Sequence, residues 1–132
     1  MEIHFKIIGL SLMTLAVVHS IFPKYFNWAK ELQPLSLINR QMMVVHTFFI
    51  AFTVFLMGLL CFSSSSDLIE TSLGKRISLG LAIFWTLRLI IQLFGYSSKL
   101  WKGKMFETTV HILFTAFWIY ASMIFWMNFL AN

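Results

Sequence analysis

Three histidines fall at matching depths in three separate hydrophobic segments of this sequence. They are His19, His46 and His111, and a fourth segment carries Arg88 and Gln92 at a similar depth. Polar and ionisable side chains are costly to hold in a lipid core, so they mark candidate functional sites there. Neutral imidazole is a common ligand of zinc, copper and iron. If the four segments cross a membrane, the spacing predicts a three-histidine metal site.

Two further side chains support this interpretation. Glu107 lies one helical turn before His111, where it is able to act as a fourth ligand or to orient the imidazole, and Gln92 suits the same supporting role. Three imidazoles and an open position would let the metal activate water or oxygen. We therefore expect a metal-dependent membrane enzyme, a hydrolase or an oxidoreductase, that acts on a lipid-like or small hydrophobic substrate. Its catalytic candidates are Glu107 and Arg88.

Haem b is an alternative cofactor for the same histidines. Two histidines from different helices at one level are able to ligate one haem iron, and His46 and His111 are the favoured pair, with His19 as a substitute for either. Arg88 and Arg40 would then pair with the haem propionates. Such a protein would serve electron transfer or sensing.

Arg88 also supports a third interpretation. It lies roughly 10 Å inside its segment, where an unpaired arginine costs at least about 2.5 kcal/mol. The arginine either holds an anion, extends its side chain to the interface, or pairs with Glu107. Glu107 alone approaches from the correct face among the acidic residues, which are Glu2, Glu31, Asp67, Glu70 and Glu107. A non-catalytic carrier or channel subunit that binds a small anion or a lipid headgroup therefore stays open. The histidines are also able to act only as hydrogen-bonding contacts between helices.

The composition places these residues in a membrane protein. Of the 132 residues, 59% are hydrophobic and only 11% are charged, with a mean hydropathy of +0.82. A soluble domain carries about 25% charged residues, so this chain cannot cover a soluble surface. The net charge of +5 suits anionic lipid headgroups, and no nucleic-acid-binding motif occurs. Cys61 is the single cysteine, which excludes an intramolecular disulfide.

The hydropathy pattern predicts an all-α, integral membrane four-helix bundle forming a single domain, residues 1–132. Four antiparallel spans are expected at residues 5–22, 42–62, 77–95 and 107–130, each near the 17–25 residues that a bilayer needs. The first span should stop at Pro23. An amphipathic stretch after it predicts one short interfacial helix, ended by Pro34. In the second loop, residues 63–76, Gly74 is expected to form a turn or a cap.

Antiparallel spans bring the candidate residues to one face of the bilayer. His19 and Gln92 lie near the ends of their spans, and His46 and His111 lie near the beginnings of theirs, each about 5–6 Å below the helix end. Residues three or four positions apart lie on the same face of a helix, so each candidate belongs to a stripe of residues along its span. The stripe on the third span contains Trp85, Arg88, Gln92 and Tyr96, and the one on the fourth contains Glu107, His111, Thr115, Trp118 and Ser122.

Basic residues predict which face is cytoplasmic. The first and third loops carry six of them, Lys24, Lys30, Arg40, Lys99, Lys102 and Lys104, whereas the termini and the second loop carry three, Lys6, Lys75 and Arg76. Positive charges favour the cytoplasmic side, so both termini are expected outside and the candidate site near the cytoplasm. The expected location is the bacterial inner (plasma) membrane, with membrane lipids as partners and a homo-oligomer as an option. No residue motif assigns the chain to a family.

Overall fold

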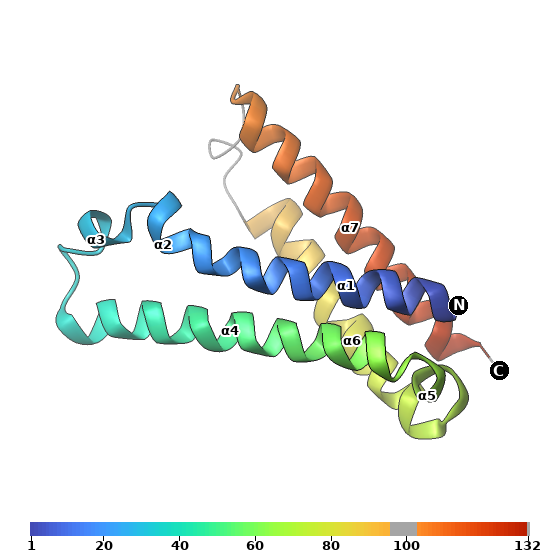
Figure 1. Cartoon of the computed structure of the whole chain (residues 1–132). Helices are drawn as coiled ribbons and strands as arrows, with labels where there is room; N and C mark the ends of the chain where they lie inside the picture. The colour runs from blue at the N-terminus through green and yellow to red at the C-terminus, as the bar shows by residue number, and fades with distance from the viewer. Residues whose placement is uncertain (96–102, 132) are drawn as a thin grey trace. The chain divides into compact units, whose positions relative to one another are not determined.

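The structure, a computed structural model, describes residues 1–95 and 103–131 and contains four long apolar helices (Figure 1). The membrane-spanning candidates cover Glu2–Tyr25, Leu37–Ser63, Ser72–Gly95 and Met105–Leu130. No strand occurs in the part of the chain that the structure describes. The all-α class and the four predicted spans are therefore confirmed. Predictions that concern Tyr96, Lys99 and Lys102 lie outside the described residues.

The chain divides into two compact units. The N-terminal unit comprises Glu2–Ser65, and the C-terminal unit comprises Ser66–Asn132 together with Met1. The elements, in chain order, are α1 (Glu2–Val18), η1 (His19–Ile21), α2 (Phe22–Tyr25), α3 (Trp28–Glu31), α4 (Leu37–Ser63), α5 (Ser65–Glu70), α6 (Ser72–Ile90), η2 (Ile91–Gly95) and α7 (Met105–Leu130). The long helices are α1 and α4 in the first unit and α6 and α7 in the second.

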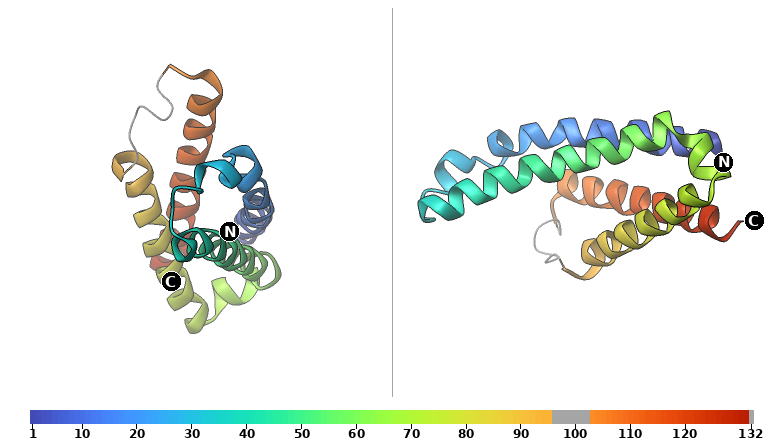
Figure 2. Two further views of the ribbon diagram at one scale, coloured as in Figure 1. Left: turned by 90° about the vertical axis from the view of Figure 1, so that its left-hand side faces the viewer. Right: turned by 90° about the horizontal axis from the view of Figure 1, so that it is seen from below.

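In the N-terminal unit, α1 and α4 run side by side in opposite directions (Figures 1 and 2). The two helices come into close backbone contact at Gly9 and Gly58. A Cβ atom added to Gly9 would lie 2.6 Å from the Gly58 carbonyl oxygen, and one added to Gly58 would lie 2.6 Å from the Gly9 carbonyl oxygen. Because no real side chain tolerates that distance, the two glycines permit the close contact between the helices.

Pro23 does not end the first span, which corrects the predicted boundary. The helical path continues through η1 into α2, and Pro23 occupies the first turn of α2. Proline is tolerated in a first turn because the N–H that it lacks would have no helical partner there. The span therefore reaches Tyr25.

The short helix predicted in the first loop is present as α3, which follows α2. Asn27 separates them with a φ of 52°, in the left-handed region that asparagine tolerates better than most residues. Asn27 therefore separates the end of the first span from this short helix, which ends at Glu31, before Pro34.

The second and third spans begin earlier than predicted, because each has an N-terminal cap. The Ser36 hydroxyl accepts a hydrogen bond from the Asn39 N–H at 3.4 Å, and the Thr71 hydroxyl accepts one from the Gly74 N–H at 2.9 Å. Gly74 lies inside α6 against the backbone of α5 and forms no turn. Its missing side chain is what lets α5 and α6 pack together.

In the C-terminal unit, α6 packs against α7, and polar side chains join the two helices. Trp126 donates from Nε1 to the Thr86 hydroxyl at 2.9 Å. The fully buried Asn128 donates from Nδ2 to Ser78 Oγ at 2.7 Å and to the Leu68 carbonyl oxygen at 2.9 Å. Asn128 thereby connects α7 to both α6 and α5.

Candidate functional site

Three of the predicted site residues form one hydrogen-bonded chain in the C-terminal unit. Arg88 on α6 donates from Nη1 to Gln92 Oε1 at 3.0 Å. Gln92 lies in η2, a π-helical turn that continues α6, and its Nε2 is 3.0 Å from Nδ1 of His111 on α7. Single π-helical turns occur frequently at functional sites. Gln92 is buried, with 7% of its surface exposed.

The direction of these hydrogen bonds determines the tautomer of His111. A guanidinium only donates, so the Gln92 oxygen faces Arg88 and the Gln92 amide N–H faces His111. Nδ1 of His111 must then accept, and a neutral imidazole that accepts at Nδ1 carries its proton on Nε2. The chain of residues therefore has donor groups at both ends, the guanidinium of Arg88 and the Nε2–H of His111.

Two stacked tryptophans lie beside this chain. The rings of Trp85 and Trp118 are 4.5 Å apart with an interplanar angle of 9°. Cζ of Arg88 lies 5.5 Å from the centre of the Trp118 ring, within the range of a cation–π contact. Both indoles are almost completely buried. The contact with Trp118 and the bond to Gln92 hold the guanidinium in one position.

Four buried polar atoms near these residues lack a hydrogen-bond partner in the described part of the chain. They are Nε1 of Trp85, Nε1 of Trp118, Oγ1 of Thr115 and Oγ of Ser122. His111, Thr115, Trp118 and Ser122 share one face of α7. We call these residues the polar seam: Trp85, Arg88, Gln92, His111, Thr115, Trp118 and Ser122. Because all four atoms are able to donate, the seam suits a ligand rich in acceptor oxygens.

His19 and His46 belong to the N-terminal unit. Nδ1 of His19 lies 2.8 Å from the Leu15 carbonyl oxygen, and Nδ1 of His46 lies 2.8 Å from the Met42 carbonyl oxygen. A carbonyl oxygen only accepts, so each Nδ1 carries the proton and each Nε2 keeps its lone pair. His19 is half-buried, with its ring 4.7 Å from that of Phe22, whereas His46 is exposed. Both imidazoles have the tautomer that a metal-ligating Nε2 requires.

The described residues contain no cluster of side chains suited to hold a metal ion. No group of three or more His, Cys, Asp or Glu side chains lies where it could hold an ion within residues 1–95 and 103–131. His111 belongs to a different unit from His19 and His46. The three-histidine site therefore stays a prediction, as does a haem held by His46 and His111.

Glu107 and Arg40 were the remaining sequence candidates. Glu107 lies in the first turn of α7, half-buried, and makes no ion pair or hydrogen bond with the described residues. Arg40 lies in the first turn of α4, and its buried Nε has no hydrogen-bond partner among the described residues. Arg40 and Arg88 are in different units, so a shared pairing with haem propionates stays a prediction.

The comparisons with known proteins add no relative. No protein-family model matches this chain, and neither a curated protein nor a solved structure matches it. Any inference about function therefore rests on the chemistry of the chain's own residues.

Proposed function

We propose that this integral membrane protein binds the anionic headgroup of an amphipathic molecule at the polar seam of its C-terminal unit. The observation that carries the proposal is the hydrogen-bonded chain of Arg88, Gln92 and His111. The headgroup would be a carboxylate or a phosphate. The protein would act as a carrier or as a channel subunit, and the ligand would come from the bilayer.

The guanidinium of Arg88 supplies the charge for this site. A planar guanidinium matches the geometry of carboxylate and phosphate oxygens and binds them with paired hydrogen bonds. The low dielectric of a membrane span strengthens the attraction between this charge and an anionic headgroup. Gln92 uses one guanidinium nitrogen, Nη1, and keeps the group oriented.

The other donors of the seam extend the site beyond the arginine. The hydroxyls of Thr115 and Ser122 and the two indole N–H groups would satisfy ester or further headgroup oxygens. The stacked and almost completely buried rings of Trp85 and Trp118 supply the apolar surroundings of these donors. An anionic head joined to an apolar body uses all of these groups.

Native mass spectrometry of the protein released from nanodiscs tests the proposal. The nanodiscs contain phosphatidylcholine, either with added phosphatidic acid or with added palmitate. In a third sample the nanodiscs contain phosphatidylcholine alone, and inorganic phosphate is present in the buffer. We expect retention of phosphatidic acid or palmitate above phosphatidylcholine, and the three arms distinguish a lipid phosphate, a lipid carboxylate and a free anion. Equal retention of phosphatidylcholine and of both anionic lipids would refute the proposal.

Arg88→Gln removes the charge and keeps a polar side chain of similar length. Arg76→Gln is the matched control, because Arg76 is an exposed arginine on the same helix, outside the seam. We expect Arg88→Gln to reduce retention of the anionic component about ten-fold or more, as for the loss of a charged hydrogen bond. Arg76→Gln should retain it. An equal loss in both variants would indicate general attraction to the positive protein surface.

A metal-dependent enzyme is the second candidate, and the tautomers of His19 and His46 favour it. Each has its proton on Nδ1, which leaves Nε2 able to bind zinc, copper, iron or the iron of haem b. Elemental analysis and a visible spectrum of the purified protein test this candidate. A stoichiometric metal that His46→Ala removes would support it, and a Soret band would identify haem. A metal-free, colourless protein that still binds anionic lipid would exclude it.

A further inference from the structure

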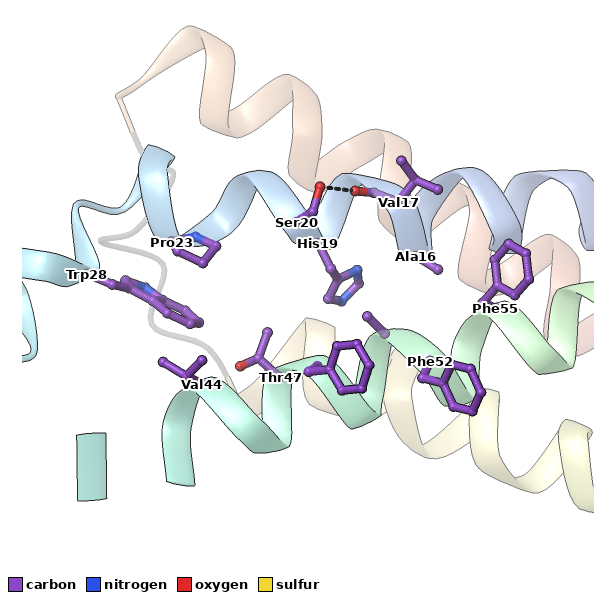
Figure 3. Close-up of a pocket in the computed structure, with 12 residues that line it drawn as sticks. Ala16, Val17, His19, Ser20, Pro23, Trp28, Val44, Thr47, Phe52 and Phe55 are labelled. Carbon is purple, nitrogen blue, oxygen red and sulfur yellow. Dashed lines mark hydrogen bonds between the residues drawn. The ribbon is translucent and has the colours of Figure 1, made fainter. Parts of the chain in front are cut away.

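The N-terminal unit contains a pocket whose chemistry differs from that of the polar seam. The pocket lies between α4 and the stretch from the end of α1 to α3, and its volume is about 330 Å³ (Figure 3). It is lined by Ala16, Val17, His19, Ser20, Pro23, Trp28, Val44, Thr47, Phe48, Ala51, Phe52 and Phe55. The lining includes one of the predicted site residues, His19.

The walls of the pocket are largely apolar, with a few polar atoms among them. Phe48, Phe52 and Phe55 from α4 supply aromatic surface for a hydrocarbon body. Trp28 of α3 lies at the opposite end from Phe55 (Figure 3). A pocket with apolar walls and a few placed polar groups is typical of small-molecule sites. Its volume of about 330 Å³ is near the lower limit of roughly 300–1,000 Å³ for such sites, which suits a single chain better than a complete two-chain lipid.

The polar atoms of the pocket are mainly acceptors. His19 points from η1 toward α4, and its protonated Nδ1 faces Leu15, so its Nε2 presents a lone pair (Figure 3). The Thr47 hydroxyl donates its proton to the Met43 carbonyl oxygen at 2.7 Å, which leaves the oxygen able to accept. The Ser20 hydroxyl donates to the Val17 carbonyl oxygen at 2.7 Å and lies on the side of the helix away from α4 (Figure 3). A ligand headgroup that donates a hydrogen bond matches these acceptors.

The charge of the lining narrows the ligand further. None of the lining residues is Lys, Arg, Asp or Glu. A carboxylate or phosphate would meet acceptor atoms without a cation, and an ammonium would lie in an apolar pocket without a counter-charge. A neutral hydroxyl satisfies both conditions, because it donates to His19 or Thr47 and is able to accept from the Trp28 indole N–H.

We infer that this pocket binds a neutral, single-chain hydrophobic alcohol, with its hydroxyl at His19 and Thr47 and its hydrocarbon chain along the phenylalanines of α4. The site is independent of the anion site at the polar seam: it lies in the other unit and selects a donor headgroup in place of an acceptor headgroup.

Photolabelling of the full-length protein in nanodiscs tests the inference. The probes are decanol with a diazirine in its chain, its methyl ether and the matching carboxylic acid. We expect the alcohol to label residues 16–28 and 44–55 about five-fold more than the ether, the value of about one hydrogen bond. Unlabelled decanol should compete. Equal labelling by alcohol and ether, which indicates bulk lipid contact only, would overturn the inference, as would preference for the acid.

Two pairs of variants locate the site. Thr47→Val removes an acceptor at nearly constant shape and should reduce the preference for the alcohol, whereas Thr53→Val, at an exposed threonine of α4 outside the lining, should not. His19→Leu should remove most of the preference. Ala51→Trp fills the pocket and should abolish competition, in contrast to Ile50→Trp on the exposed face. A Thr53→Val effect equal to that of Thr47→Val would contradict the assignment, even if His19→Leu fails to fold.

Discussion

Gln92 and His111 connect the third and fourth spans through one hydrogen bond, with Nε2 of Gln92 3.0 Å from Nδ1 of His111. Arg88 determines the direction of this bond, because its guanidinium requires the Gln92 oxygen as an acceptor. A charge on α6 thereby determines which nitrogen of an imidazole on α7 carries a proton. The protonation of His111 at Nε2 follows from this relationship.

Gln92→Leu should remove the preference of His111 for the tautomer that is protonated at Nε2. Without the amide N–H, Nδ1 of His111 loses the donor that keeps it unprotonated, so the imidazole should populate both neutral tautomers. The measurement is the ¹⁵N chemical shifts of the His111 ring in labelled protein. We expect one tautomer, protonated at Nε2, in the wild type and a mixture in the variant. A wild-type His111 protonated at Nδ1 would contradict the network.

Gly58→Ala should destabilise the N-terminal unit. The added Cβ would lie 2.6 Å from the Gly9 carbonyl oxygen, so α1 and α4 would have to separate. Overpacking of this kind costs about 1–3 kcal/mol of unfolding free energy. Gly80→Ala is the control, because nothing lies within 4 Å of its added Cβ. That change should leave the stability unchanged or raise it by up to about 1 kcal/mol, since alanine favours helix. Denaturant unfolding followed by circular dichroism measures both, and equal stabilities for the two variants would disprove the close contact.

Asn128 should contribute to stability through its two buried hydrogen bonds. Asn128→Leu removes the donor to Ser78 and Leu68 and should cost about 1–3 kcal/mol. Ser78→Ala removes only one partner. In a double-mutant cycle the two changes should show a coupling of at least about 0.5 kcal/mol, because the side chains contact each other directly. Additive effects on the unfolding free energy would show that the Asn128–Ser78 bond contributes nothing.

The loops should be accessible from opposite sides of the membrane. In a Cys61→Ala background, Asn27→Cys places a thiol in the first loop and Ser66→Cys places one in the second, both at exposed positions. The distribution of basic residues predicts the first loop in the cytoplasm. A membrane-impermeant thiol reagent added to intact cells should label the second position and spare the first. The reverse pattern would invert the proposed orientation.

The sequence was sufficient to predict the helices and the spacing of the seam. Long apolar runs predict spans in any packing arrangement, because the bilayer requires them. The spacing from Arg88 to Gln92 places both on one helix face, and their depth predicts that Gln92 and His111 are at similar levels. The helix starts were missed at the second and third spans, where the capping bonds of Ser36 and Thr71 extend the helices beyond the apolar runs.

Other features depend on tertiary packing and have no local signal. The contact of Gly9 with Gly58 joins single glycines on two helices, without a repeated small-residue motif. Asn128 reads as an isolated polar residue near a span end, yet it is fully buried against α5 and α6. The pocket beside His19 results from the path of η1, α2 and α3, and the sequence indicates neither the break at Asn27 nor the continuation through Pro23.

The most direct test of the central claim is a measurement of lipid affinity. The ligand is phosphatidic acid or palmitate, whichever the wild type retains, and the proteins compared are the wild type, Arg88→Gln and Arg76→Gln. The claim is that the guanidinium of Arg88, oriented by Gln92, holds an anionic headgroup. The account predicts a Kd at least about ten-fold higher for Arg88→Gln than for the wild type, and a Kd for Arg76→Gln within about two-fold of the wild type. A Kd for Arg88→Gln equal to that of the wild type would contradict it.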